Sequence, residues 1–376
     1  MPIAYGPGRL AEIGKHCAAL GMTNPLIVTD KGSRELPFIV QTQSSLADQG
    51  LTSHVFSDIS PNPRDHEIKN ARGVFRSGSH DGVIAMGGGS GMDGGKATCL
   101  TANNEIDLWR FNYDAPVAEV GVHNAFPPLV CIPTTSGTGA ETESTAMITD
   151  TQRGMKLCVW HPTLKPSLAL LDPKLTLGLP PHLTAWTGID ALIHAIEAYC
   201  VPDFHPQCDG TALEAIKLIT RWLPIAVADP NNLEARGGMQ VGSCLGGIAF
   251  LKGLGLVHAI SHMVGADYDT HHGLTNAVAL PAVMRFNAPL LTEKLPAMAA
   301  ALGLEDNEFE SFYRALCALL DALDIPRSLA DLGVPLSAAP ALAQKAHLDA
   351  AALTNARPAS VADIEAILEE AITNGR

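Results

Sequence analysis

The first half of the chain alternates short apolar runs with longer amphipathic stretches, and this alternation constrains the fold more than any other feature. The apolar runs are nearly continuous, as expected of strands that are covered on both faces of a sheet. The stretches between them are long enough for helices, which favours a parallel α/β sheet with right-handed crossovers. The expected strands are residues 26–29, 54–56, 82–86, 129–132 and 168–171, and the expected helices are residues 34–47, 64–76 and 90–101.

The pattern changes after Gly178-Leu-Pro-Pro181, a cluster of helix- and strand-breaking residues. Beyond it, amphipathic stretches rich in Ala and Leu run to the end of the chain without a convincing strand. A length of 376 residues also favours two hydrophobic cores over one. We therefore expect an α/β domain at residues 1–180 and an all-helical domain at residues 181–376.

The composition indicates a compact, acidic protein. Hydrophobic residues make up 47% of the chain and charged residues 17%, and the net charge of −14 argues against nucleic acid and anionic membrane surfaces as partners. Neither a signal peptide nor an apolar run of membrane-spanning length is apparent. The eight cysteines lack Cys-x-x-Cys spacing, which is typical of free thiols in a reducing compartment. These features favour a cytoplasmic metabolic protein with a small-molecule substrate.

A glycine-rich loop, Gly87-Gly-Gly-Ser-Gly-Met-Asp-Gly-Gly-Lys96, follows one expected strand and opens a helix. Glycines let the backbone approach a phosphate, and free amides at a helix start bind its charge, so we expect a pyrophosphate on this loop. The loop is not a complete Rossmann fingerprint, because the segment after residue 101 does not resemble the next strand, and it lacks the Ser/Thr of a P-loop. The alternative is a tight turn in which Ser90 and Asp93 form a capping box.

Two further polar features follow expected strands. The loop Pro133-Thr-Thr-Ser-Gly-Thr-Gly-Ala-Glu141 offers hydroxyls and amides at a strand's carboxyl end, where open α/β sheets bind ligands. Two such loops suit a dinucleotide better than a mononucleotide. Asp30 ends the first expected strand, where it could accept hydrogen bonds from a ribose diol and repel a 2′-phosphate, or could serve only as a helix cap.

A set of potential metal ligands lies in the second half. Asp190 and His194 are four residues apart in an expected helix and so share a face, and His258 and His262 repeat this spacing before His271-His272. A carboxylate with several imidazoles suits Fe, Zn, Mn or Ni, and the missing thiolates argue against a structural zinc. Either pair alone could arise by chance among fourteen histidines. Together they favour a metal centre with Lewis-acid chemistry.

With these segments identified, the sequence resembles the iron-containing, group III alcohol dehydrogenases over nearly its whole length. Such an ordered series of motifs is highly specific. The matching segments are 26–30, Pro61-Asn-Pro63, 87–96, 133–141, Asp172-Pro173, 188–199, 253–262, His272-Gly273 and Asn276.

The resemblance implies the dehydroquinate synthase-like fold of that family, with a dinucleotide-binding α/β domain at 1–180 and a helical metal-binding and substrate domain at 181–376. It makes His262 an active-site histidine beside the metal, which relays a proton or positions a ligand. The implied metal ligands are Asp190, His194, His258 and His272. The implied cofactor-binding residues are Asp30 at the adenosine ribose, Gly87, Gly88, Gly89 and Ser90 at the pyrophosphate, and Thr134, Thr135, Thr138 and Lys156.

Three positions depart from the family pattern. Thr142-Glu143 stands where Val-Thr is often found, the segment from Phe250 to Gly253 is one residue shorter than in better-known members, and Ala356 replaces a frequent proline. Phe250, Trp186 and the residues around His205 are candidates for the substrate pocket. The departures concern specificity more than chemistry.

The leading interpretation is a metal-dependent NAD alcohol dehydrogenase or aldehyde reductase, with Fe²⁺ as the first choice of metal, zinc, manganese or nickel as alternatives, NAD preferred to NADP, and a dimer or larger homo-oligomer. The metal would polarise the substrate oxygen and the cofactor would carry the hydride. The alternatives are a dehydroquinate-synthase-like lyase and a polyol (glycerol-type) dehydrogenase. Residues 186–215 contain no Lys or Arg and Lys252 stands alone before His258, which argues against a strongly anionic substrate. A catalytically inactive scaffold would be expected to lack a ligand position, and none is missing.

Overall fold

A computed structural model of the chain describes residues 1–121 and 125–376. The described residues divide into two units by their internal contacts: unit 1 comprises Met1–Thr135 and Ala140–Leu177, and unit 2 comprises Ser136–Gly139 and Gly178–Arg376. The division into domains at residue 180 stays a prediction, because contacts do not test whether either part folds alone.

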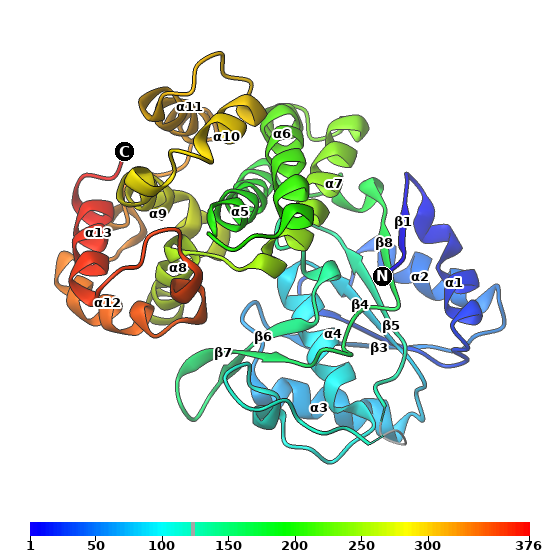
Figure 1. Cartoon of the computed structure of the whole chain (residues 1–376). Coiled ribbons are helices and arrows are strands. Elements are labelled where there is room, and N and C mark those ends of the chain that lie inside the picture. The colour runs from blue at the N-terminus through cyan, green and yellow to red at the C-terminus, as the bar shows by residue number, and fades with distance from the viewer. Residues whose placement is uncertain (122–124) are drawn as a thin grey trace. The chain divides into compact units, whose positions relative to one another are not determined.

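A parallel sheet forms the centre of unit 1, as the alternating apolar runs predict (Figure 1). Its strands are β1 (Ile3–Tyr5), β2 (Leu26–Asp30), β3 (His54–Ile59), β4 (Val83–Gly87), β5 (Leu129–Pro133) and β8 (Leu168–Leu171). Within the described part of the chain, these six strands pair in the order β1-β8-β5-β4-β2-β3, and every pairing is parallel. The predicted α/β fold class is confirmed.

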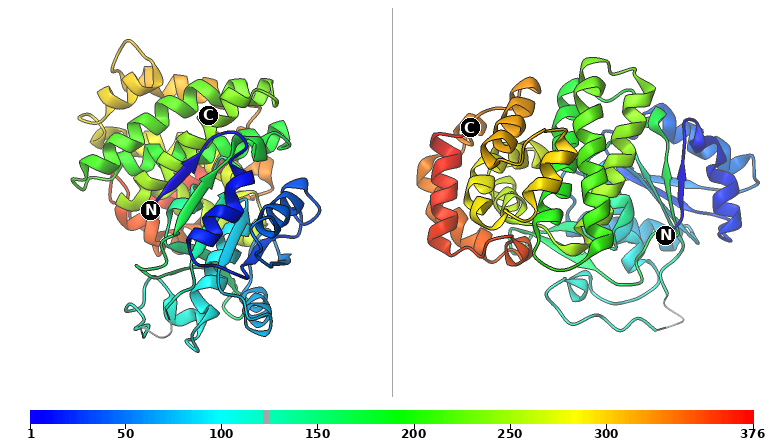
Figure 2. Two further views of the ribbon diagram at one scale, coloured as in Figure 1. Left: turned by 90° about the vertical axis from the view of Figure 1, so that its right-hand side faces the viewer. Right: turned by 45° about the horizontal axis from the view of Figure 1, so that its top comes forward.

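Helices cover both faces of this sheet, which explains why its strands are apolar at consecutive positions. Leu26 and Val28 of β2 pack with α3 and α4 on one face, and Ile27 packs with α1 and α2 on the other. Figure 2 shows α1 and α2, in dark blue, together on their side of the strands. The helices of unit 1 are α1 (Ile13–Ala19), α2 (Pro37–Ala47), α3 (Asp65–Ser77) and α4 (Gly89–Ala102).

The sequence analysis missed β1 and an antiparallel hairpin formed by β6 (Thr145–Asp150) and β7 (Met155–Trp160). β1 is only three residues long. Buried positions alternate along β6, so it lacks the continuous apolar run by which we identified the other strands. Strands covered on both faces therefore show continuous apolar runs, whereas a strand covered on one face shows alternation, and both kinds occur in this unit.

The regular secondary structure described in unit 2 is all helical, as predicted. Its helices are α5 (Pro181–Cys200), α6 (Pro206–Ala228), α7 (Leu233–Ala249), α8 (Leu256–Tyr268), α9 (His272–Asn287), α10 (Leu295–Leu302), α11 (Phe309–Ala322), α12 (Ala339–His347) and α13 (Val361–Thr373). α5 packs against α6, α7 and α9, and α13, red in Figure 2, lies beside α12 and α9. Because α5 is surrounded by other helices, almost all of its residues from Gly188 onward are buried, including its charged ones.

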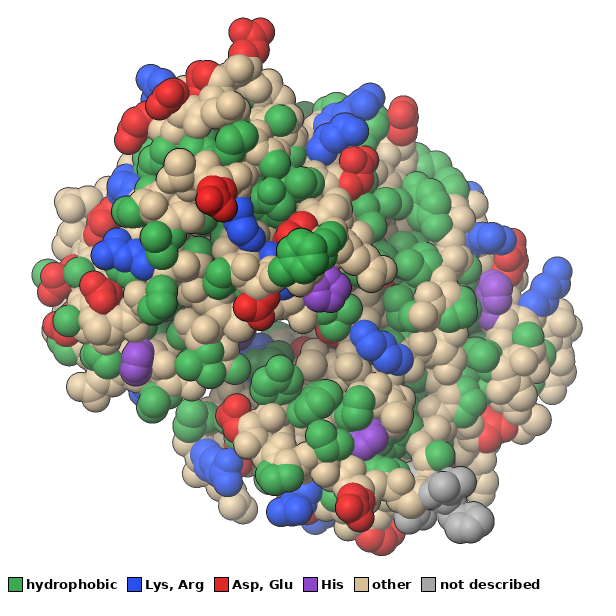
Figure 3. Space-filling view, viewed as in Figure 1, with side chains coloured by type: hydrophobic (Ala, Val, Ile, Leu, Met, Phe, Trp, Pro, Cys, Tyr) green, Lys and Arg blue, Asp and Glu red, His purple; other side chains and the backbone are tan. Residues whose placement is uncertain are grey.

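The surface carries charges of both signs. On the face shown in Figure 3, acidic (red) and basic (blue) side chains are interspersed. Within residues 1–121 and 125–376, no single helix has the length and apolar character needed to cross a membrane, and only α7 and α8 taken together, bent by 103°, satisfy that criterion.

Close packing of α4 on β4 depends on Gly95. A Cβ atom at this position would lie 2.4 Å from Cβ and 2.8 Å from Cα of Ala85. We expect Gly95→Ala to lower the free energy of unfolding by about 1–3 kcal/mol, the usual cost of overpacking, as measured by denaturant titration. Gly73→Ala in α3 is the matched control, because a Cβ there meets nothing within 4 Å, and it should stabilise the protein by about 0.5–1 kcal/mol. Equal effects of the two substitutions would contradict this account.

Candidate active site

The carboxyl ends of three adjacent strands bring the predicted nucleotide-binding residues of unit 1 together. β4 pairs with β2 on one side and with β5 on the other. Asp30 ends β2, Gly87 ends β4, and Thr134 directly follows β5 and donates its backbone N–H to the carbonyl of Gly87 at 2.9 Å. Parallel sheets bind ligands at this edge. Asp30, the glycine-rich loop and the start of the threonine-rich loop therefore form one cluster.

The glycine-rich loop presents backbone amides at the start of α4. Gly88 is the N-cap residue, and no side chain caps the helix. The alternative in which Ser90 and Asp93 form a capping box is therefore wrong, and the first amides of α4, from Gly89 and Ser90 onward, are suited to an anion.

Both the backbone conformation at position 87 and the nearby side chain of Asp30 require a glycine there. Gly87 has φ +144°, and a Cβ there would lie 2.9 Å from Oδ2 of Asp30. The Asp30 carboxylate thus lies against the glycine-rich loop. It also accepts the backbone N–H of Ser33 at 3.0 Å and the hydroxyl of Ser33 at 2.8 Å, so Asp30 does stabilise the following turn. Because a carboxylate can accept about four hydrogen bonds, this turn leaves capacity for a ligand.

The remaining predicted cofactor residues are distributed over more than one element. Thr135 belongs to unit 1, whereas Thr138 lies in the segment 136–139 of unit 2. Lys156 lies on β7, and its Nζ donates to Oδ1 of Asn62 at 3.3 Å. Lys96 of α4, which has no predicted role, is buried and donates to the carbonyl of Ala140 at 2.7 Å, which ties α4 to the end of the threonine-rich loop.

The four predicted metal ligands converge inside unit 2. Asp190 and His194 on α5 and His258 on α8 each offer a ligand atom, and these atoms lie within 4.8 Å of one another. Nε2 of His272, at the start of α9, lies 3.7 Å from Oδ1 of Asp190. Packing of three helices thus brings together side chains that the sequence shows only as separate pairs.

Asn276 shows that this cluster has more acceptors than donors. Its Nδ2 atom lies 2.7 Å from Oδ1 of Asp190, 3.2 Å from Nε2 of His258 and 3.1 Å from Nε2 of His272. An amide group has two N–H bonds for these three acceptors. Within the described residues, the buried Oδ1 of Asn276 also lacks a hydrogen-bond partner. The residues therefore fit a divalent metal ion, which would satisfy the converging lone pairs.

Burial sets the protonation states that metal binding requires. Burial lowers the pKa of His258 well below its ordinary value, and it lowers the pKa of His194 although Asp190 acts in the opposite direction. Burial alone would raise the pKa of Asp190, but the nearby His194 and His272, together with the hydrogen bond from Asn276, hold that pKa below its usual range. Neutral imidazoles and an ionised carboxylate at neutral pH are the forms that bind metals.

His262 lies beside the cluster with a carboxylate of its own. Its ring stacks on that of His272 at a centroid distance of 5.5 Å, and its Nδ1 lies 2.9 Å from Oδ2 of Asp349. Because a carboxylate only accepts hydrogen bonds, Nδ1 carries the proton and Nε2 is the acceptor. The sequence analysis missed Asp349, which is 87 residues from His262 and has no local pattern that would reveal it.

One aromatic ring contacts a proposed ligand, and another contacts the residue that precedes one. The ring of Phe250 is 5.0 Å from that of His194, and the ring of Trp186 is 5.0 Å from that of His271. His205, also considered for the pocket, instead caps α6 by accepting the backbone N–H of Cys208. Phe250 and Trp186 are therefore the better candidates for contact with substrate.

The chain matches known proteins over nearly its whole length. Residues 2–173 match the family described as "Iron-containing alcohol dehydrogenase", and residues 184–372 match "Fe-containing alcohol dehydrogenase family, C-terminal". The chain is 36% identical to 1,3-propanediol dehydrogenase of Klebsiella pneumoniae, covering 98% of this chain and 96% of that protein. It is also 36% identical to NAD-dependent methanol dehydrogenase of Bacillus methanolicus, covering 98% and 97%.

Solved structures are similar to the same extent. A structure of 1,3-propanediol oxidoreductase superimposes with a TM-score of 0.94 at 36% identity, covering 99% of this chain and 98% of that one. An alcohol dehydrogenase from Oenococcus oeni gives a TM-score of 0.94 at 34% identity, with 98% of each chain covered. These comparisons confirm the resemblance found in the sequence.

Removing one ligand should remove the metal without unfolding the protein. We expect His194→Ala or His258→Ala to abolish tight metal binding, because each deletes one of the converging donors, and circular dichroism should remain that of a folded protein. Elemental analysis after dialysis provides the measurement. His347→Ala, at an exposed position of α12, is the control and should retain the wild-type metal content. Unchanged metal content in both ligand variants would exclude this site.

Proposed function

The chain belongs to the iron-containing alcohol dehydrogenase family and is an alcohol oxidoreductase, and from this premise we propose that it is an NAD-dependent dehydrogenase of small alcohols with Fe²⁺ in unit 2. The observation that supports it most is the convergence of Asp190, His194, His258 and His272, whose lone pairs exceed the available donors. An imidazole-rich site also accepts zinc, manganese or nickel, so iron is proposed from the family.

In this proposal, unit 1 binds the cofactor through its strand ends. The amides from Gly87 to Ser90 hold the pyrophosphate, and the Asp30 carboxylate accepts hydrogen bonds from the adenosine ribose. The same carboxylate would repel a 2′-phosphate, which favours NAD over NADP. Thr134, Thr135, Thr138 and Lys156 are proposed as further cofactor contacts.

In this proposal, residues of unit 2 bind the substrate oxygen, and one of them accepts the hydroxyl proton. When bound, the metal polarises the alcohol oxygen and the nicotinamide exchanges the hydride. His262 offers Nε2 as the acceptor for the hydroxyl proton, and Asp349 keeps the ring in that tautomer through Nδ1. The return of this proton accompanies the reverse reaction, aldehyde reduction.

The proposed substrate is a small, uncharged alcohol or diol. Relatives are named for 1,3-propanediol and methanol, and the aromatic rings of Phe250 and Trp186 lie near the ligand cluster. Lys252, the one cation close to His258 in sequence, is buried and bound to Asp209 at 2.5 Å, so it is unsuited to an anionic substrate. The lyase and glycerol-type alternatives are not favoured, since relatives are named 1,3-propanediol dehydrogenase, methanol dehydrogenase and probable alcohol dehydrogenase.

Cytoplasmic location and homo-oligomerisation, as a dimer or larger assembly, are part of the proposal. The eight cysteines form no disulfide, as expected for a reducing compartment. β1 is an edge strand on which Ile3 and Tyr5 are almost half exposed, and a second copy would cover such apolar side chains.

Metal removal tests the proposed chemistry. Chelated protein should oxidise 1-propanol or 1,3-propanediol with NAD at least about 100-fold more slowly, a loss of about 3 kcal/mol of transition-state stabilisation, while NADH fluorescence titration should show retained nucleotide binding. Re-addition of Fe²⁺ should restore turnover. Undiminished turnover by metal-free protein would refute the mechanism.

A substitution in the glycine-rich loop tests whether cofactor binding and metal binding can be lost separately. Gly88→Val should weaken NADH binding by blocking approach to the phosphates and should leave the metal content intact. The Cβ at this position would make only ordinary contacts with Thr135, at 3.4 and 3.5 Å, so the fold should tolerate it. Loss of metal from this variant would contradict the assignment of cofactor and metal to separate units.

Asp30 tests the cofactor preference. We expect Asp30→Gly to cost about 1–3 kcal/mol in NAD binding and to narrow the ratio of kcat/KM for NAD over NADP, since the variant loses the acceptor and the repulsive charge together. Ser33→Ala is the matched control, because it removes only the hydroxyl that binds Asp30 and should keep the preference. Equal use of both cofactors by the wild-type protein would show that the assignment of Asp30 is wrong.

A further inference from the structure

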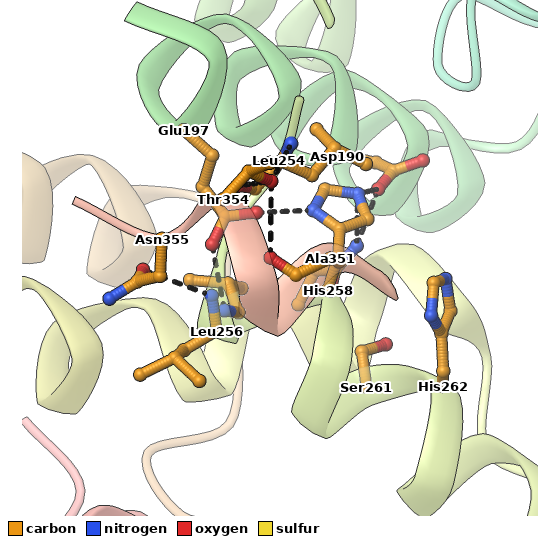
Figure 4. Close-up of polar contacts among 12 residues, drawn as sticks. Asp190, Glu197, Leu254, Leu256, His258, Ser261, His262, Ala351, Thr354 and Asn355 are labelled. Carbon is orange, nitrogen blue, oxygen red and sulfur yellow. Dashed lines mark hydrogen bonds and ion pairs between the residues drawn. The ribbon is translucent and has the colours of Figure 1, made fainter. Parts of the chain in front are cut away.

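Glu197 is a buried carboxyl group that contacts the proposed metal ligand His258. Its side chain is 4% exposed and that of His258 is 1% exposed. Oε2 of Glu197 lies 2.6 Å from Nδ1 of His258, and Oε1 accepts the backbone N–H of Val257 at 2.7 Å. Figure 4 shows Glu197 and Asp190 approaching the His258 ring from the same helix.

The periodicity of α5 explains this arrangement. Asp190, His194 and Glu197 are four and three residues apart, so they share one face of the helix. Asp190 and Glu197 are separated by about 10 Å along the helix axis, and the imidazole of His258 lies between them. Its Nε2 is 3.7 Å from Oδ1 of Asp190, while its Nδ1 is bound to Glu197.

A purely structural role would be to cap α8, and this role does not require a charge. The N-cap residue Gly255 provides no side-chain cap, so distant residues satisfy the first amides of α8. Asn355, which is neutral, accepts the N–H of Leu256 at 3.1 Å, next to the amide that Glu197 accepts. Burying a carboxyl group is costly unless hydrogen-bond partners compensate, and the contact that distinguishes Glu197 from Asn355 is the His258 ring.

Thr354 holds the same part of the chain without touching the ring. Its hydroxyl donates to the carbonyl of Leu254 at 2.8 Å and accepts the N–H of Leu254 at 3.2 Å (Figure 4). The start of α8 is therefore held by two kinds of contact. Thr354 and Asn355 fix its backbone, and Glu197 contacts both its backbone and the ligand side chain.

We propose that Glu197 is a positioning residue for the metal centre, which orients the His258 ring and keeps the proton on Nδ1 so that Nε2 presents its lone pair to the metal. This inference rests on the metal site of the proposed function. A carboxylate accepts from Nδ1–H and from Val257 at once, which fixes both the tautomer and the rotation of the ring. Partners of this kind raise the basicity of a ligand imidazole and strengthen metal binding.

Glu197→Gln separates this role from capping because it keeps the size and removes one acceptor. If its Oε1 accepts the N–H of Val257, its amide N–H₂ faces Nδ1 of His258 and shifts the proton to Nε2, which then cannot bind a metal. If Oε1 accepts from His258 instead, two donors face each other at Val257. Thr354→Val is the matched control, since it is isosteric and removes two contacts at the start of α8 without touching the ring.

Co²⁺ binding to the full chain, measured by competition with a chelator and by visible absorption, tests the proposal. Glu197→Gln should weaken Co²⁺ affinity by roughly 10–100-fold and alter the Co²⁺ spectrum. Thr354→Val should leave both unchanged, even if the metal-free variant unfolds at a lower temperature. Wild-type affinity in Glu197→Gln, or an equal loss in Thr354→Val, would overturn the positioning role.

A measurement on the wild-type protein keeps the proposal testable if Glu197→Gln does not fold. Nitrogen-15 NMR of the Zn²⁺-loaded protein should find the His258 proton on Nδ1, and a proton on Nε2 would refute the assignment. A wild-type protein that binds neither Co²⁺ nor Zn²⁺ would instead refute the metal centre itself. The two failures are therefore distinguishable.

Discussion

Burial of carboxyl groups is the constraint around which unit 2 is arranged. α5 is covered by other helices, and it carries Asp190 and Glu197 into that interior. Removing a carboxylate from water costs several kcal/mol unless partners compensate. Here the partners are imidazoles, the amide of Asn276 and the first amides of α8. The imidazoles and Asn276 are, or directly contact, proposed ligands. The interactions that stabilise the buried carboxyl groups therefore also order the candidate metal site.

In unit 1, the groups suited to an anion belong to the backbone and not to side chains. The glycine-rich loop brings the start of α4 to the edge of the sheet, and the absence of a side-chain cap within its described residues leaves the first amides available to a phosphate. Asp30 lies against this loop, so acceptor and donor groups are ordered by the same strand ends. The buried Lys96 of α4 also donates to the carbonyl of Ala140, which connects this helix to the threonine-rich loop.

The three departures from the family pattern lie beside buried or proposed functional residues. Glu143, where a threonine is frequent, is buried, and burial raises its pKa while the neighbouring Lys165 acts in the opposite direction. Phe250, whose position could not be transferred by comparison, lies against His194. Ala356 lies between Asn355, which contacts α8, and Arg357, whose guanidinium lies 4.1 Å from the ring centroid of Phe286. Glu143 therefore follows the threonine-rich loop of unit 1, and in unit 2 Phe250 contacts a proposed ligand while Ala356 is next to a residue that binds the start of α8.

The sequence by itself determined features that lie within one element or follow it directly. Continuous apolar runs identified five of the six strands of the parallel sheet. The spacing of Asp190 and His194 predicted that both side chains face one point, because residues four apart on a helix share a face. Glu197 lies three residues after His194 on the same face of the helix, but the sequence does not show which residue it contacts. Only the tertiary structure decided that Glu197 meets His258, 61 residues away, and that Asp349 meets His262. Such contacts depend on how the helices pack, and the sequence pattern of one helix does not show which residue of another helix it will contact.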